Sequence, residues 1–268
     1  MEVKIDFTTS AQQNADGHYK NSKKLALKKE GAEQTVKELE KRLSESLKAQ
    51  QDDELEEKHA VTVRTEKQWY EKFHWFFTSD GKLAIGGRDA QQNDAINAKH
   101  FEDNDIFFHA NIFGASVVVL KEGAAAGNEI REEVAQFAAC YSSAWDEGLH
   151  VVDVYAMRRD QVSKSTGKGS LGTGSFLLSG EREWYRNTQL SLIMFVKDDV
   201  LNVAPAITFA KAEKVYKYVT LTQGNKKKSD AAKIISKLLE YYDLDEIIRQ
   251  LPAGNFSIKT QTEQAVSD

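Results

Sequence analysis

A long polar stretch with one narrow line of apolar residues limits what the N-terminal part of the chain can fold into. From about Ser10 to Ala49 the residues are mostly charged or polar and almost free of helix breakers. One narrow stripe of this kind is typical of a coiled coil rather than of a helix buried in a globular core. We therefore predict a helical coiled-coil arm over residues 1–68, capped at its start by Thr8, Thr9 or Ser10. The stripe, with spacings of three and four, consists of Ala32, Val36, Leu39, Leu43 and Leu47.

The arm has two candidate geometries. Gln50–Glu54 is a polar and acidic stretch at which the helix can reverse, and we expect Leu55–Phe77 to return antiparallel from it. A single continuous helix is the competing geometry, and the sequence leaves both open. A lone solvated helix is disfavoured, because a polar helix of this length with one leucine seam needs something to pack on.

Charge and cysteine content narrow the class of protein. The only cysteine, Cys140, cannot form an internal disulfide, which fits a reducing compartment. No apolar run approaches the roughly 20 residues that span a bilayer, and the N-terminus lacks a signal-peptide pattern. We expect a cytoplasmic protein without membrane association. The net charge is −5 and no segment is strongly basic, so contact with RNA would need a local basic patch.

The central part, residues 69–190, begins with an aromatic cluster. Six of the nine residues in Trp69–Phe77 are aromatic. With helical spacing, Trp69, Phe73 and Phe76 would share one face. Stacking on RNA bases is one use for such rings, but a role in the core is favoured because the cluster runs straight into a strand.

The stretch Ser79–Asn93 contains the densest combination of turn and polar residues. Its strand-like alternation ends at Gly86 and Gly87, which we expect to turn the backbone through positive φ. Three polar residues follow at once, and polar groups on a glycine turn are well placed to meet a partner. The alternative is an ordinary hairpin with a surface ion pair. The three residues are Arg88, Asp89 and Asn93.

Other parts of the chain predict a sheet with covering helices and a smaller C-terminal unit over 191–268. A polar, disordered tail is expected over 261–268. Expected helices are 95–99, 128–144, 229–242 and 244–251. Expected strands are two around Gly114 within 105–121, then 150–157, 176–179, 190–196, 206–209 and 215–221.

The motifs that would indicate catalysis or a cofactor are weak. Gly167–Gly172 fits G-x-G-x-x-G, but it lies between a loop and a strand instead of between a strand and a helix. His100 and His109 have no metal-ligand spacing, and His109 is better explained as a buried histidine. We predict no metal, no cofactor and no catalytic activity. A rival interpretation is a nuclease or RNA-modifying enzyme that uses Asp89, Asp105 and His109.

One local basic cluster stands out in this acidic chain. Four basic residues and one acidic residue occupy 158–168, at the end of a predicted strand. Arg182 follows beside Trp184 and Tyr185, which adds guanidinium and aromatic surface suited to phosphates and bases. An ordinary solvated surface is the alternative. The basic residues of the cluster are Arg158, Arg159, Lys164 and Lys168.

These stretches resemble the NFACT-R domain of the NFACT proteins, which are ribosome-associated quality-control factors. The order and spacing match over about 110 residues, and Lys226–Gly254 resembles the C-terminal piece of archaeal members. The loop Ser165–Gly172 departs from the commoner family loop, and the sequence shows no NFACT-N or helix-hairpin-helix region. The matching stretches are Trp69–Phe76, Ser79–Asn93, Asp105–Ala115, Ser142–Asp146, Gln161–Lys164 and Thr173–Phe176, followed by Gly180.

The resemblance implies an RNA-binding, ribosome-engaging module without independent tailing activity. The expected partners are the large ribosomal subunit, tRNA or rRNA, and a separately encoded NFACT-N half. We predict an α+β fold with a coiled-coil arm, a mixed-sheet NFACT-R domain over 69–190 and a small α/β extension. A pure protein-interaction module acting through the coiled coil is a further alternative. Predicted RNA contacts are Arg88, Arg158, Arg159, Lys164, Lys168 and Arg182. Predicted motif or structural residues are Gly86, Gly87, Asp89, Asn93, His109 and Trp145.

Overall fold

The structure, a computed structural model, describes residues 4–62, 67–166, 169–211 and 217–260, without the side chains of residues 45, 47–62, 210 and 211. The chain divides into two units, Met1–Lys58 and His59–Asp268. We call them the arm unit and the core unit and describe each by itself. The predicted tail over 261–268 lies outside the described residues.

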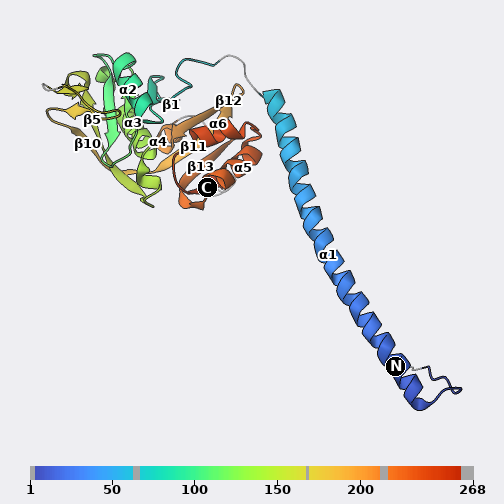
Figure 1. The fold of residues 1–268 in the computed structure, drawn as a ribbon. Coiled ribbons are helices and arrows are strands. Elements are labelled where there is room, and N and C mark those ends of the chain that lie inside the picture. Colours follow the sequence, from blue (N-terminus) through green and yellow to red (C-terminus); the bar gives the residue numbers. More distant parts are fainter. Residues whose placement is uncertain (1–3, 63–66, 167–168, 212–216, 261–268) are drawn as a thin grey trace, which may run out of the picture. The chain divides into compact units, whose positions relative to one another are not determined.

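One helix dominates the arm unit. Helix α1 runs unbroken over Ala11–Thr62, so the predicted reversal at Gln50–Glu54 is wrong and the continuous geometry is right (Figure 1). The reversal segment holds no glycine or proline, and glutamine and glutamate are good helix formers, so nothing there ends the helix. The predicted cap is confirmed at Ser10, whose Oγ accepts from the Gln13 N–H at 3.3 Å while the Gln13 Oε1 accepts from the Ser10 N–H.

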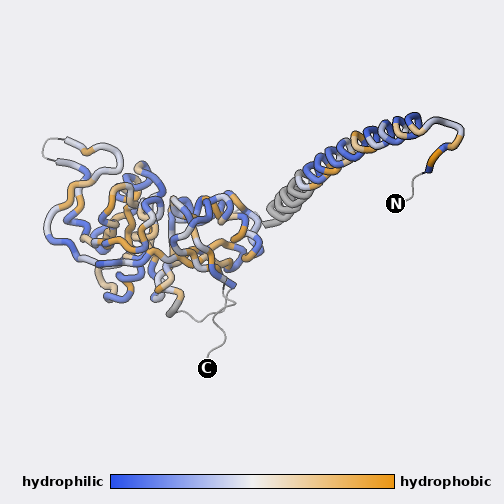
Figure 2. The backbone as a smooth tube through the Cα atoms, turned by 90° about the horizontal axis from the view of Figure 1, so that it is seen from below, coloured by the Kyte–Doolittle hydropathy of each residue, from blue (hydrophilic) through white to orange (hydrophobic). Residues whose placement is uncertain are grey.

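The apolar stripe of α1 is exposed where its side chains are described. Val36, Leu39 and Leu43 are 53%, 58% and 61% exposed, and no other described segment of the arm unit covers them. The tube in Figure 2 is mostly hydrophilic along the described part of α1, with a few apolar positions. Such a long helix with a single seam fits a coiled coil.

A six-stranded sheet forms the first layer of the core unit. Its order is β1-β2-β4-β3-β5-β10. The α+β class is confirmed. All the described strand pairs of this sheet are antiparallel and mostly short connections join them, whereas a mixed sheet was expected. The strands are β1 (His74–Phe77), β2 (Leu83–Gly86), β3 (Ile106–Ala110), β4 (Val118–Leu120), β5 (Val151–Arg158) and β10 (Glu183–Gln189).

Both faces of this sheet are buried, which explains the continuous apolar run predicted to be central. In β4, Val118 and Leu120 belong to the core shared with α3 (Asn128–Cys140), whereas Val119 faces the opposite core. That opposite core includes Ile96 of α2, which spans Ala90–Lys99 and is longer than predicted because Asp89 caps it.

A second, four-stranded sheet carries the C-terminal helices, and its order is β12-β11-β13-β14. Leu192, Met194 and Ile235 belong to the same hydrophobic core as α3 and the first sheet. Residues 69–190 and 191–268 therefore share one core. The elements are β11 (Ser191–Lys197), β12 (Val200–Pro205), α4 (Ala206–Lys211), β13 (Tyr218–Lys226), α5 (Lys228–Leu239), α6 (Leu244–Gln250) and β14 (Phe256–Thr260), with α5 and α6 side by side (Figure 1).

The remaining elements are short. They are the 3-10 turns Gly123–Ala125, Ser143–Trp145 and Arg159–Gln161, and the two-residue strands β6 (Val162–Ser163), β7 (Ser165–Thr166), β8 (Gly169–Ser170) and β9 (Leu177–Leu178).

Two element predictions are wrong. Trp69–Phe77 forms turns and then β1, although its predicted core role holds for Phe73, Trp75 and Phe76. Ala206–Phe209 is helical, because β12 ends at Pro205 and α4 docks on α3. The Ile207 N–H donates to the Gln136 Oε1 at 2.9 Å. Among the described helices, none is long and apolar enough to cross a membrane.

Candidate nucleic-acid interface

A pocket of about 520 Å³ collects residues from stretches that lie far apart in the sequence. They come from the start of α2, from β3 and the loop after it, from β5 and from the loop before β9. We call this pocket the motif groove. It is lined by Arg88, Asp89, Ala90, Asn93, Phe107, His109, Ile112–Ser116, Tyr155, Thr173–Phe176 and Leu178.

Three polar residues after β2 build one wall of the groove. Asp89 caps α2 by accepting from the Gln92 N–H at 2.8 Å, and the Asn93 Oδ1 accepts from the Val117 N–H at 3.0 Å. The Arg88 Nη2 donates to the Phe73 carbonyl oxygen at 2.8 Å and to that of Glu71 at 3.3 Å. Each side chain thus fixes the local backbone while it faces the groove.

The predicted glycine turn has a different physical basis. Neither Gly86 nor Gly87 has a positive φ, so that prediction is wrong. Glycine is required at position 87 because Asn93 approaches the backbone there too closely for a Cβ atom. The strand, the turn and the following polar residues are as predicted.

Aromatic rings form the opposite wall. The rings of Phe107 and His109 are nearly parallel, with centroids 6.1 Å apart, and the Tyr155 hydroxyl lies 3.3 Å from the His109 Nδ1. Burial, followed by the charge of Arg182, lowers the pKa of His109. His109 therefore contributes a neutral ring, but the side chain is only partly buried, so the prediction of a buried histidine holds only in part. Such a wall can stack a nucleobase.

Phe113 is 97% exposed and lies in the loop between β3 and β4, at the edge of the groove. The Ser143 Oγ donates to the Phe113 carbonyl oxygen at 2.6 Å, and the Ser116 N–H donates to the Tyr141 carbonyl oxygen at 2.9 Å. Gly114 turns the loop with φ +78°. The anchored loop thus presents a solvent-exposed phenyl ring. Phe113 was not singled out from the sequence, where its only signal is an aromatic residue beside the glycine break at Gly114.

Lys164 holds the loop that supplies Thr173–Phe176 to the groove. Its Nζ donates to the Asp94 Oδ1 at 2.5 Å, to the Gly172 carbonyl oxygen at 2.7 Å and to the Ser175 carbonyl oxygen at 3.2 Å. Asp94 also accepts from the Gly174 N–H at 3.1 Å. This network holds the loop before β9 against α2. That Lys164 contacts RNA stays a prediction.

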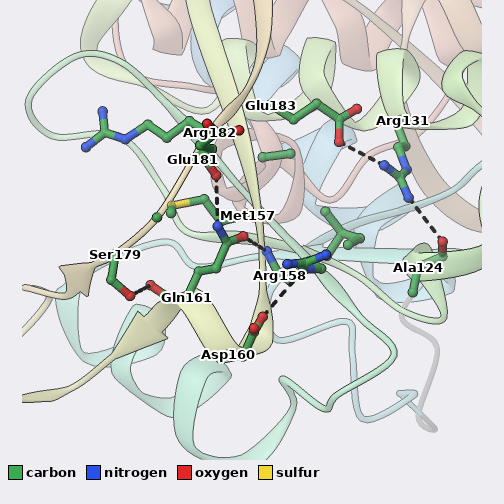
Figure 3. Close-up of a pocket in the computed structure, with 13 residues that line it drawn as sticks. Ala124, Arg131, Met157, Arg158, Asp160, Gln161, Ser179, Glu181, Arg182 and Glu183 are labelled. Atoms are coloured by element: carbon green, nitrogen blue, oxygen red, sulfur yellow. Dashed lines mark hydrogen bonds and ion pairs between the residues drawn. The ribbon is translucent and has the colours of Figure 1, made fainter.

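Two other predicted arginines lie at a second pocket, of about 780 Å³, which Figure 3 shows. Arg158 is exposed and lies 3.5 Å from Asp160. The Arg182 guanidinium lies 4.5 Å from the centre of the Tyr155 ring. Arg131 pairs with Glu183 at 2.8 Å, so both signs of charge line this pocket. Arg158 and Arg182 are brought together here, whereas Arg88 lines the motif groove.

The other predicted residues have varied settings. Arg159 donates to the Val162 carbonyl oxygen at 2.8 Å and lies over the Phe101 ring. Trp145 is buried, and its Nε1 donates to the Cys140 carbonyl oxygen at 2.7 Å. Lys168 lies outside the described residues.

The residues of the rival enzyme hypothesis do not share one pocket. Asp105 is buried and accepts from the Lys121 Nζ at 2.5 Å and from the Glu102 N–H at 2.8 Å. Asp105 is not among the residues that line the motif groove with Asp89 and His109. Burial raises the pKa of the Cys140 thiol. Within the part of the chain that the structure describes, no group of three or more metal-ligating side chains is found.

Residues 72–180 match the family described as "NFACT protein RNA binding domain". The chain is also similar to three quality-control proteins. It is 37% identical over 217 residues to the archaeal Rqc2 homologue aRqcH of Methanocaldococcus jannaschii, covering 76% of this chain and 32% of that protein. It is 33% identical over 199 residues to the Drosophila melanogaster homologue of ribosome quality control complex subunit NEMF, covering 71% and 19%.

Human NEMF is 34% identical over 182 residues, which cover 65% of this chain and 16% of that protein. The chain therefore spans about a third or less of the length of these relatives. The alignments extend well beyond residues 72–180.

Proposed function

This chain is an NFACT-R domain protein, and from this premise we propose that it binds RNA on stalled large ribosomal subunits in ribosome-associated quality control. Support comes from the family description, which names RNA binding, and from relatives whose names place them in ribosome quality control. We propose tRNA or rRNA as the RNA, no catalysis by this chain, and a separate NFACT-N half as a partner. A cytoplasmic location is part of the proposal.

The observation that carries the proposal is the exposed Phe113 beside the aromatic wall of the motif groove. A phenyl ring exposed to water lacks the roughly 1.5–3 kcal/mol of free energy that burial of the ring would contribute. Stacking of a base on such a ring recovers a similar amount, about 1–3 kcal/mol. We propose that unpaired bases stack on Phe113 and reach His109 and Phe176, while Arg88, Arg158 and Arg182 supply the positive charge.

Phosphate contacts must be local in this proposal. With a net charge of −5, the chain as a whole repels RNA, so binding has to depend on a few arginines near the groove. The Arg182 guanidinium suits this role, because an arginine over an aromatic ring keeps N–H donors for a phosphate. Arg186 lies over the Trp184 ring and also pairs with Asp153 at 2.6 Å, which offsets part of its charge.

The test is binding of the full chain to ribosomal subunits and to short single-stranded RNA. Phe113→Ala should weaken binding of the RNA by about 5- to 100-fold, which corresponds to one lost stacking contact. Phe7→Ala is a matched control, because Phe7 is 96% exposed in the arm unit. RNA sequencing and mass spectrometry of captured complexes identify the partner. RNA affinity that is unchanged in Phe113→Ala would remove the groove from the interface.

The arm supports a second candidate function, which is protein–protein interaction. Its exposed stripe of Val36, Leu39 and Leu43 fits pairing with another helix. Binding of ribosomes without any binding of RNA by the wild-type chain would favour this function.

A further inference from the structure

A third pocket, of about 430 Å³, adjoins the motif groove and shares Arg88, Gly114 and Ser116 with it. We call it the cationic pocket. No sequence pattern connects its residues, because they come from six separate segments. It is lined by His74, Arg88, Gly114, Ser116, Tyr141–Ser143, Asp146, Lys228, Arg249 and Leu251–Ala253.

Three cations from distant segments meet at this pocket. Burial and then the charge of Arg88 lower the pKa of Lys228. Burial also lowers the pKa of Arg88, an effect that the charge of Glu246 opposes and that of Arg249 adds to. Positive groups that disfavour one another in this way are stabilised by an anion. The one acidic lining residue, Asp146, is exposed, so the lining keeps a net positive charge.

Several side chains of the pocket retain N–H groups that can donate further hydrogen bonds. The Lys228 Nζ donates to the Leu251 carbonyl oxygen at 2.8 Å, and the Arg249 Nη1 donates to the Glu246 Oε2 at 2.9 Å, so each retains further N–H groups. In the described structure, the buried Arg88 Nε has no hydrogen-bond partner. A fourth group, the His74 ring, is only 6% exposed, and its Nδ1 likewise lacks a partner among the described residues.

The N-terminus of α5 is a further feature that favours an anion at this pocket. The helix begins at Lys228, and its cap residue Lys227 makes no side-chain capping hydrogen bond. The first N–H groups of a helix lack partners inside the helix and carry partial positive charge, which suits a phosphate. The positive charge of the helix N-terminus comes from backbone N–H groups, so it adds to the side-chain charges of the three cations. Lys228 contributes to the pocket through both its backbone and its side chain.

We propose that the cationic pocket binds one phosphate group of an RNA chain whose adjacent base lies in the motif groove. This inference rests on the proposed function, because RNA has to occupy the groove. Arg88 stands between the two pockets and lines both, so one nucleotide can place its base on one side of Arg88 and its phosphate on the other. Arginine, lysine and helix N–H groups are the donors that phosphate prefers.

In the first experiment, the full chain is titrated with inorganic phosphate, AMP, acetate or chloride at matched ionic strength, and the amide NMR signals are recorded. Phosphate and AMP should shift the signals of Ser143, Ser229 and Asp230. AMP alone should also shift signals of the Phe113 loop. Equal shifts with chloride would overturn the proposal, and shifts with acetate alone would identify a carboxylate site instead.

Matched variants locate the effect. Lys228→Gln with Arg249→Gln should weaken phosphate binding about tenfold or more and should lower the salt slope of RNA binding by about two. Lys237→Gln is the control, because Lys237 is an exposed lysine in the last turn of the same helix. The double variant also loses the hydrogen bond from Lys228 to the Leu251 carbonyl oxygen. If this loss reduces its melting temperature, Arg249→Gln alone is used to test the pocket. Equal effects in variants and control would overturn the inference.

The outcomes separate the inference from the proposed function. If RNA binds and depends on Phe113 but not on Lys228 and Arg249, the phosphate site is wrong and the function stands. If phosphate binds but no RNA does, the anion site stands and the RNA function fails.

Discussion

Gly87 and Asn93 are in contact so close that a Cβ atom on Gly87 would stand 2.1 Å from the Asn93 Oδ1 and 2.9 Å from the Asn93 backbone nitrogen. The same Oδ1 accepts from the Val117 N–H, and the Gly87 N–H donates to the Val117 carbonyl oxygen at 3.0 Å. Gly87, Asn93 and Val117 thus join β2, α2 and the start of β4 at the wall of the motif groove.

Gly87→Ala is therefore expected to lower the free energy of unfolding by about 1–3 kcal/mol, since backbone and a hydrogen-bonded amide have to shift. Denaturant unfolding of the full chain measures the change. Gly172→Ala is the control, because a Cβ there meets nothing within 4 Å and no positive φ opposes it. A neutral effect of Gly87→Ala would mean that Asn93 can move without cost.

The core strands could be predicted from the sequence because their signals are local. Alternation in β2 and an apolar run in β4 indicate strands directly, and Asp89 before α2 is a recognisable cap. The Gly87 contact could not be predicted, because it depends on where a later side chain returns. Residues 206–209 alternate like a strand, but contacts with α3 make them a helix.

The pockets were harder to predict than the strands. The stretch Ser79–Asn93 predicted a binding site, and Arg88 of this stretch does line the motif groove. Lys228 and Arg249 lie more than 100 residues away from Arg88 in sequence, so no spacing rule connects them. These residues line one pocket because the two sheets share one hydrophobic core, and this packing cannot be inferred from the sequence.

His74 predicts a pH dependence of stability. Its pKa is lowered well below 6.5 by burial and then by the charges of Arg88 and Lys228. Below about pH 6.5 the unfolded chain binds a proton that folded His74 does not, so the free energy of unfolding falls as pH decreases from 6.5 toward the folded pKa. One such histidine contributes a slope of up to about 1.4 kcal/mol per pH unit.

His74→Phe should remove that part of the slope, because phenylalanine keeps a ring on Tyr141 but does not titrate. His100 and His109 also have lowered pKa values, so the wild-type slope includes their contributions. The slope of the free energy of unfolding against pH is compared for wild type and variant from pH 6.5 to 5. The difference between the two slopes is the contribution of His74. Parallel stability curves would show that His74 is not held neutral.

Lys164 is predicted to act on the loop before β9. Because three acceptors already surround its ammonium group, Lys164→Met should speed hydrogen exchange at Gly174, and the salt slope of RNA binding tests the predicted RNA contact of Lys164 separately. Asp94→Asn should have the same effect on exchange. A salt slope lowered by about one in Lys164→Met but not in Asp94→Asn would instead assign Lys164 to the RNA contact.

The last prediction concerns the arm. Leu39 and Leu43 are more than half exposed on α1, and exposed leucines at this spacing gain roughly 1.5–3 kcal/mol each when a partner helix buries them. Leu39→Asp with Leu43→Asp should therefore abolish ribosome association measured by sedimentation. The melting of the core unit should stay nearly unchanged, because the two units divide at Lys58. Gln34→Asp with Ser44→Asp adds the same charge off the seam and should leave association intact. If the leucine variant unfolds the whole protein, the arm belongs to the core. If it associates normally, the seam has no partner on the ribosome.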